Sequence, residues 1–158
     1  MIYTSFYNCI LGKIILASDG KNLTGIIFNE KNHYSYLKEA QNKEDLEIFK
    51  RTKNWLDRYF KGENPPVKEI PVKLNGTEFQ QKVWMELKNI PYGKTVSYGF
   101  IADKLNIKSA RAVGNALNKN PIAIIIPCHR VIGKNGKLTG YAGGLNRKEQ
   151  LLKIEKIL

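Results

Sequence analysis

The segment "SYGFIADKLNIKSARAVGNALNK", residues 97–119, decides the expected fold of the second half of the chain. It contains two short stretches with helical character, and each opens at a serine, Ser97 or Ser109. Serine is a residue type that caps helix N-termini. Only "NIK" joins the two stretches. Two short helices with so brief a connection predict a helix-turn-helix.

Further helix signals flank this motif. Thr77 and Gln80 have the capping-box spacing at the start of "TEFQQKVWMELKNIPYG". The expected apolar stripe of that helix is Phe79, Val83, Leu87 and Ile90. Near the C-terminus, "NRKEQLLKIEKIL" repeats the capping-box spacing at Asn146 and Glu149. Its expected apolar positions are Leu151, Leu152, Ile154, Ile157 and Leu158. Between these helices, "RVIGKNGKLTGYAGG" predicts a β-wing or a loop.

The first third of the chain has a different character. The segments "IYTSFYN", "GKIILAS" and "LTGIIFN" are rich in β-branched and aromatic residues and are separated by turn residues, which predicts an antiparallel meander. A helix should follow in "EDLEIFKRTKNWLDRYFKG" and end at Gly62, with one apolar face made by Leu46, Phe49, Leu56, Tyr59 and Phe60. The stretch "ENPPVKEIPVKLNG" holds three of the six prolines and predicts a linker or a crossing between domains. We therefore expect two domains, 1–75 and 76–158.

Composition excludes several classes of protein. The 158-residue chain has no run of 18 apolar residues and no secretion signal at its start, so we expect no membrane span and a cytoplasmic location. Cys9 and Cys128 are too few and too far apart for a disulfide framework or a zinc cluster. We interpret Cys9 as structural and His33 as a surface-loop residue, and we expect no metal and no cofactor.

The charge is unevenly distributed. The formal net charge is +12, and residues 74–158 carry 14 Lys and Arg against five Asp and Glu, whereas residues 1–73 carry 12 against nine. A concentrated basic surplus suits a polyanion, because neutralised phosphates release counterions. A Lys-rich solvated surface without a nucleic-acid partner would give the same count.

The stretch "IIIPCHRVIG", residues 124–133, places one of two cysteines beside one of two histidines. The run from Ile122 to Ile126 predicts a buried strand, and Pro127 leads from it into Cys128 and His129. A thiolate is a strong nucleophile, but an ordinary cysteine is mostly protonated at neutral pH and needs a base or a cation nearby. The pair therefore indicates nucleophilic chemistry at the bottom of a pocket. A buried structural thiol is the alternative interpretation of Cys128.

These segments together resemble the O6-alkylguanine-DNA alkyltransferases, the methylated-DNA–protein-cysteine methyltransferases. The resemblance rests on "IPCHRV", "SYGFIADKL", "RAVGNALNKNP" and "GYAGGLNRKEQLLKIE", and it covers residues 76–158 nearly without a gap. It implies an α/β fold in which an N-terminal ribonuclease H-like domain with an antiparallel sheet and helices precedes a mostly α C-terminal winged helix-turn-helix domain. It also implies irreversible transfer of an alkyl group from O6-alkylguanine in double-stranded DNA, and plausibly from O4-methylthymine, to Cys128. Residues 1–75 would be a scaffold that supplies no catalytic group, and we expect a monomer that binds no membrane.

The resemblance assigns roles to residues near Cys128. It implies that the thiol proton passes through water to His129, that Glu155 orients His129, and that Asn120 holds the turn. Tyr98 would donate a proton to the departing guanine. Further expected substrate contacts are the floor of the pocket at Pro127, the carbonyl of Val131, the amide of Ala142, and the rim residues Leu138 and Thr139.

The same resemblance implies that the second helix of the motif enters the minor groove while the damaged base is flipped out of the duplex. Arg111 would fill the gap in the base stack, although a simple phosphate contact is the alternative. Small residues would permit a close approach to DNA. The expected DNA-binding residues are Arg111, Ala110, Ala112, Gly114 and Ser97.

Three other functions fit parts of the sequence. Alkyltransferase-like proteins bind lesions without transfer, but they lack the cysteine that this chain has at Cys128. A helix-turn-helix regulator that senses electrophiles would carry an additional cysteine-rich zinc domain, and this chain has no such cysteines. A cysteine hydrolase built on Cys128 and His129 would not require the basic second half.

Overall fold

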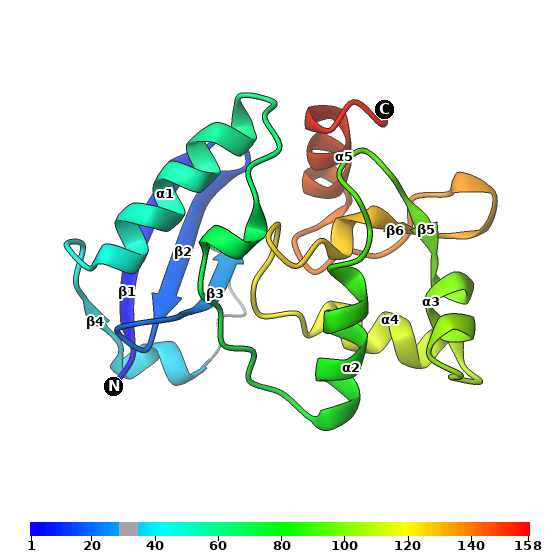
Figure 1. The fold of residues 1–158 in the computed structure, drawn as a ribbon, viewed down its shortest axis with the longest axis horizontal. Helices are drawn as coiled ribbons and strands as arrows, with labels where there is room; N and C mark the ends of the chain where they lie inside the picture. The colour runs from blue at the N-terminus through cyan, green and yellow to red at the C-terminus, as the bar shows by residue number, and fades with distance from the viewer. Residues whose placement is uncertain (29–34) are drawn as a thin grey trace. The chain divides into compact units, whose positions relative to one another are not determined.

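A computed structural model describes residues 1–28 and 35–158 of the chain, whose trace is drawn in Figure 1. The chain divides into two compact units, Met1–Asn75 and Gly76–Leu158. His33, expected on a surface loop, lies outside the described residues. No helix in the described ranges combines the length and the apolar character that crossing a lipid bilayer requires.

The first unit is built on a four-stranded sheet. Its strands are β1 (Tyr3–Cys9), β2 (Gly12–Ser18), β3 (Leu23–Phe28) and β4 (Gln41–Asn42), in the order β3-β2-β1-β4. The pairs β1–β2 and β2–β3 are antiparallel, which confirms the predicted meander. The short β4 was not predicted, and it pairs parallel to β1.

One long helix, α1 (Glu47–Phe60), packs on the three longer strands, as Figure 1 shows. Its buried side chains recur at helical spacing and are Ile48, Phe49, Thr52, Trp55, Leu56 and Tyr59. Two residues of the expected apolar face, Leu46 and Phe60, are only half-buried. Beyond the C-terminus of α1, Gly62 takes a φ of 93°, a left-handed conformation that glycine adopts without steric cost.

The proline-rich stretch is attached to the first unit over most of its length. A short 3-10 turn covers Val67–Glu69. Leu23 donates its N–H to Pro71 O at 2.8 Å and accepts from Lys73 N at 2.9 Å. Trp55 Nε1 also donates to Pro66 O at 2.9 Å. Up to Lys73 the stretch therefore belongs to the first unit, because its backbone pairs beside β3.

The second unit is mainly helical. Its helices are α2 (Glu78–Leu87), α3 (Tyr98–Lys104), α4 (Ala110–Asn118) and α5 (Leu145–Ile154). The predicted helix-turn-helix is α3 and α4, which contact each other, and α4 also contacts α2. The largest buried side chains of this unit include Trp84, whose Nε1 donates to Ala116 O at 2.8 Å. Two short strands, β5 (Val96–Ser97) and β6 (Val131–Ile132), form a parallel pair.

Three of the four predicted helix starts are confirmed. The hydroxyls of Ser97 and Ser109 accept from Phe100 N and Ala112 N, and Thr77 and Gln80 form both bonds of a capping box. The prediction of a second capping box, at Asn146 and Glu149, is wrong. Helix α5 begins after Gly144, with no side-chain cap, and Glu149 instead forms an ion pair with Lys153 at 3.4 Å.

Two of the expected apolar positions in these helices are exposed. Phe79 lies in the first turn of α2 and is 39% exposed. Leu158 is 58% exposed, because α5 ends at Ile154 and the chain leaves the helical path. Lys156 takes a φ of 62° just beyond that end.

The isoleucine run is buried as expected but is not a strand. Ile124 takes a φ of 73°, which is rare for a β-branched residue. Ile125 N donates to Ala123 O at 2.8 Å, and Ile126 N donates to Ile122 O at 3.1 Å, so the run coils into tight turns. In the segment predicted as a β-wing or a loop, β6 is followed by a loop and not by a β-hairpin, and a 2.8 Å bond from Gly133 N to Lys137 O closes the turn.

Candidate active site

Cys128 opens a single 3-10 turn, Cys128–Arg130, that follows Pro127. Pro127 has φ −82° and ψ 63°, and Cys128 N donates across it to Ile126 O at 2.8 Å. Proline restricts φ to near this value. Pro127 is buried, and Cys128 is only 5% exposed. The backbone therefore fixes where the sulfur lies.

The side chain of Asn120 braces this turn. It is buried just beyond α4. Its Oδ1 accepts from Ile122 N at 3.0 Å, and its Nδ2 donates to Ile126 O at 2.8 Å and to Cys128 Sγ at 3.2 Å. One amide thus spans the coiled isoleucine run and reaches the sulfur.

His129 and Glu155 form a buried pair. His129 Nε2 lies 2.6 Å from Glu155 Oε2, and neither side chain is exposed. Because the carboxylate accepts, Nε2 is the nitrogen that carries the proton in a neutral ring. His129 Nδ1 is also buried, and it has no hydrogen-bond partner in the described part of the chain. A lone pair on Nδ1 can therefore accept a proton.

Sequence reasoning missed two further partners of Glu155. Arg130 donates from Nε to Glu155 Oε1 at 2.8 Å and from Nη2 to Oε2 at 3.2 Å. Gly93 N donates to Oε1 at 3.1 Å. Arg130 Nη1 also donates to Ile90 O at 2.8 Å. Arg130 stands beside the Cys-His pair in the sequence, which was the available signal.

The protonation states of the three groups follow from these contacts. Burial alone would raise the pKa of Glu155, but the hydrogen bonds and charges of His129 and Arg130 outweigh it and lower the pKa to about 2. Burial lowers the pKa of His129, and the attraction of Glu155 offsets only part of that effect. Burial raises the pKa of the Cys128 thiol, against the smaller effects of Asn120 and the Lys148 charge. At neutral pH the site therefore holds a carboxylate, a neutral imidazole and a thiol.

Lys148 is the other functional candidate that sequence reasoning missed. Its side chain is fully buried, and burial lowers its pKa to about 8. The available signal in the sequence was the helical spacing of Lys148 relative to apolar residues. Residues 148, 151, 152 and 155 share one face of a helix, and Leu151, Leu152 and Glu155 are buried with it.

The predicted substrate residues lie on three segments of the second unit. Tyr98 begins α3, and its hydroxyl accepts from Thr139 Oγ1 at 3.2 Å and lies 3.4 Å from Gly140 O. Val131 is buried at the start of β6. The structure thus brings Tyr98 and Thr139 together. Leu138 is half-buried, and Ala142 is exposed in the turn before α5.

Four of the predicted DNA-binding residues lie in the first half of α4 and differ in exposure. Ala110 and Arg111 are exposed, and Ala112 and Gly114 are half-buried. A Cβ on Gly114 would lie 3.8 Å from Cε1 of Tyr98, so the helix passes close to that ring. The buried residues Val113, Ala116 and Leu117 attach the helix to the core.

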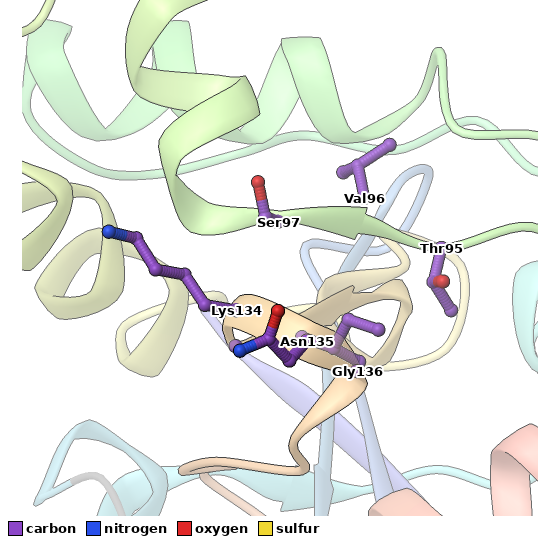
Figure 2. Close-up of a pocket in the computed structure, with 8 residues that line it drawn as sticks. Thr95, Val96, Ser97, Lys134, Asn135 and Gly136 are labelled. Carbon is purple, nitrogen blue, oxygen red and sulfur yellow. The ribbon is translucent and has the colours of Figure 1, made fainter.

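Ser97 is not part of α4 but ends β5 and precedes α3. Its hydroxyl accepts from Phe100 N at 3.0 Å, so it caps α3. It also lines a pocket between β5 and the turn Lys134–Gly136, shown in Figure 2. The pocket contains neither Cys128 nor His129, so it is separate from the thiol site.

Two family models match the chain. The model described as "6-O-methylguanine DNA methyltransferase, ribonuclease-like domain" matches residues 2–74, and "6-O-methylguanine DNA methyltransferase, DNA binding domain" matches residues 78–157. The chain belongs to the 6-O-methylguanine DNA methyltransferase family.

Curated relatives and solved structures agree with this assignment. Methylated-DNA–protein-cysteine methyltransferases of Methanosarcina acetivorans and Haemophilus influenzae are 48% and 42% identical over 157 residues. The alignments cover 98% of both chains for the former, and 99% of this chain and 87% of the relative for the latter. The O6-methylguanine methyltransferase of Mycobacterium tuberculosis has a TM-score of 0.90 at 43% identity, covering 99% of this chain and 93% of that one. A structure of the M. tuberculosis protein in complex with DNA has a TM-score of 0.86 at 43% identity, covering 98% and 92%.

Replacing Glu155 with Gln should destabilise the second unit by about 3 kcal/mol at pH 7, because Arg130 loses its buried anion. The folded-state pKa of about 2 lies below the ordinary value. The carboxylate therefore stabilises the fold above pH ~4.5, and this contribution disappears as the pH falls toward 2. In urea unfolding between pH 2 and 7, the free energy of unfolding should fall less toward acid pH in the variant than in the wild type.

The matched control is Glu149→Gln on the same helix, where the partner Lys153 and the carboxylate are both exposed. That change should cost less than about 1 kcal/mol. Equal acid sensitivity in wild type and Glu155→Gln would contradict the role assigned to this carboxylate.

Proposed function

We propose that this chain is a DNA repair protein that removes the alkyl group from O6-alkylguanine in double-stranded DNA and transfers it irreversibly to Cys128. Each molecule reacts once, because the thioether product leaves no route back to the thiol. One observation carries the proposal: a buried cysteine, held by Asn120 and followed by a buried His129–Glu155 pair, occurs in a chain of the methyltransferase family.

The chemistry is a displacement at carbon. The Cys128 thiol gives up its proton, and the sulfur attacks the alkyl carbon while the bond from that carbon to guanine O6 breaks with its electrons on the base. His129 Nδ1 is the proposed acceptor of the thiol proton, through water, and Glu155 stabilises the resulting imidazolium. Tyr98 supplies a proton to the departing guanine. The His129 imidazolium then returns its proton through water to the Tyr98 phenolate, so that in sum the thiol proton ends on the base and the alkyl group on sulfur.

Recognition of the base would use backbone groups around the thiol. The Val131 carbonyl would accept from the guanine amino group, and the Ala142 amide would donate to O6. Pro127 would form the floor of the pocket, with Leu138 and Thr139 at its rim. The same proposal includes transfer of the methyl group from O4-methylthymine to Cys128 at this site.

Access to a base inside a duplex requires flipping. The first half of α4 is suited to a narrow groove, because Ala110, Ala112 and Gly114 project little beyond the backbone. Arg111 is the exposed cation in this half that we propose enters the stack. Ser97 would contact DNA from the start of α3. The surplus of positive charge in residues 74–158 supports this assignment, as does the complex of the M. tuberculosis relative with DNA.

The remaining features of the proposal concern context. Residues 1–75 would act as a scaffold, and residues 76–158 would bind DNA and carry the chemistry. The protein would work as a cytoplasmic monomer, without a cofactor or a metal. Cys9 and Cys128 form no disulfide with each other in the described residues, as a reducing compartment favours.

Incubation with duplex DNA that contains O6-methylguanine should add one methyl group per chain, on Cys128, after which transfer stops. Mass spectrometry of the intact chain and its peptides gives the stoichiometry and the position, and the half-exposed Cys9 is an internal control. Cys128→Ser should lose transfer. Repeated turnover, or tight binding of the lesion without a mass shift, would contradict the proposal.

Arg111→Ala should slow transfer from damaged duplex DNA by about tenfold or more, because flipping costs a few kcal/mol without a group to fill the stack. Transfer from free O6-benzylguanine should change far less. Lys119→Ala, at the other end of α4, removes the same charge from an exposed position and serves as the control. Equal loss on both substrates would contradict any role of Arg111 that is specific to DNA. Full rescue of duplex repair by Arg111→Lys would exclude the proposed insertion in favour of a phosphate contact.

A further inference from the structure

Lys148 makes an unusual set of contacts for a buried lysine. Its Nζ donates to Val131 O at 2.6 Å and to Thr139 O at 2.8 Å, and it lies 3.5 Å from Gly140 O. The side chain is fully buried on α5. No carboxylate in the described ranges forms an ion pair with it. The hydrogen bonds of the ammonium in the described ranges therefore all go to backbone carbonyls, and Nζ also lies 5.9 Å from the centre of the Tyr98 ring.

These carbonyls belong to two separate segments of the second unit. Val131 begins β6, directly after the turn that contains Cys128. Thr139 and Gly140 lie in the loop that leads to α5, and the Tyr98 hydroxyl lies 3.5 Å and 3.4 Å from their carbonyl oxygens. Lys148 thus joins the segment that carries the reactive sulfur to the segment that contacts Tyr98.

Carbonyl oxygens that converge on one point repel each other unless a donor lies between them. An ammonium group supplies three N–H bonds and a positive charge, so it can hold all three oxygens at once. A carbonyl oxygen has two lone pairs, and at Val131 the lysine occupies one of them. The second lone pair is then held in a fixed direction for another donor.

We propose that Lys148 is a positioning residue that fixes the Val131 carbonyl in the direction from which it accepts the 2-amino group of guanine. Discrimination between guanine and a purine without that amino group then depends on Lys148. This inference rests on the proposed function, because it assumes that an alkylated purine enters the pocket beside Cys128. It differs from a role in activating the thiol, which would affect every substrate alike.

The test compares O6-methylguanine with O6-methylhypoxanthine, which lacks the 2-amino group, at one position of the same duplex. The single-turnover rates of transfer to the chain give a guanine-to-hypoxanthine ratio. A change in the reactivity of Cys128 cancels in this ratio, because both substrates meet the same sulfur. The variant is Lys148→Met, which keeps an unbranched side chain and removes the donors.

The ratio should exceed one in the wild type and fall by about threefold to tenfold in Lys148→Met, the range that one neutral hydrogen bond supplies. Lys153→Met should keep the wild-type ratio, because Lys153 lies on the same helix, is exposed and pairs with Glu149. Thermal unfolding and the rate of Cys128 alkylation by iodoacetamide show whether the fold and the thiol are intact.

An unchanged ratio in Lys148→Met, or a ratio of one in the wild type, would overturn the inference while leaving alkyl transfer itself established. No transfer by the wild type from either substrate would instead overturn the proposed function. If Lys148→Met does not fold, Lys148→Arg is the decisive variant. It keeps the charge, but its planar guanidinium cannot replace a compact ammonium among three converging carbonyls. Its ratio should also fall, and an unchanged ratio there would equally exclude the positioning role.

Discussion

The buried carboxylate of Glu155 is the interaction on which the rest of the second unit depends. A carboxylate without exposed surface is tolerated only when charged and polar groups compensate for the loss of water. Here His129, Arg130 and the Gly93 amide supply that compensation. These partners come from the Cys128–Arg130 turn and the loop after α2, whereas Glu155 ends α5. The group that orients the histidine is therefore the same group that joins three segments of the fold.

The second constraint is the strained turn of isoleucines that precedes Cys128 in the chain. A β-branched residue at positive φ costs on the order of 1–3 kcal/mol, and Ile124 adopts this conformation in a fully packed environment. The Asn120 side chain offsets that cost by bonding to both ends of the turn, at Ile122 and Ile126. The sulfur of Cys128 is thus held from the N-terminal side by Asn120 and from the C-terminal side through His129 and Glu155. This arrangement explains why a polar cluster is retained inside an otherwise apolar core.

Local signals in the sequence predicted those elements whose determinants are local. Ser97, Ser109 and Thr77 cap the expected helices, because an N-cap depends on residues within one turn of itself. The antiparallel meander followed from the alternation of strands and turn residues. The pairing of His129 with Glu155 was available only through the family resemblance, since 26 residues separate them. The charge distribution alone favoured a nucleic-acid partner only slightly over a Lys-rich solvated surface.

The predictions that were wrong depended on interactions between distant residues. The isoleucine run has strand propensity, but hydrogen bonds from Asn120 favour turns over extension. The spacing of Asn146 and Glu149 fits a capping box, yet α5 starts at Leu145 and leaves Asn146 within its first turn. Lys148 was overlooked because lysines are rarely fully buried. Its burial depends on carbonyls from β6 and the following loop, which no pattern within α5 specifies.

The central claim is that Glu155 fixes His129 as a neutral ring with its proton on Nε2 and an available lone pair on Nδ1. Nitrogen NMR of ¹⁵N-labelled histidine, followed from pH 5 to 8, measures this directly. The account predicts the Nε2–H tautomer at pH 7 and a pKa below the ordinary value of about 6.5. A proton on Nδ1 at pH 7, or a ring that titrates above its ordinary value, would contradict it.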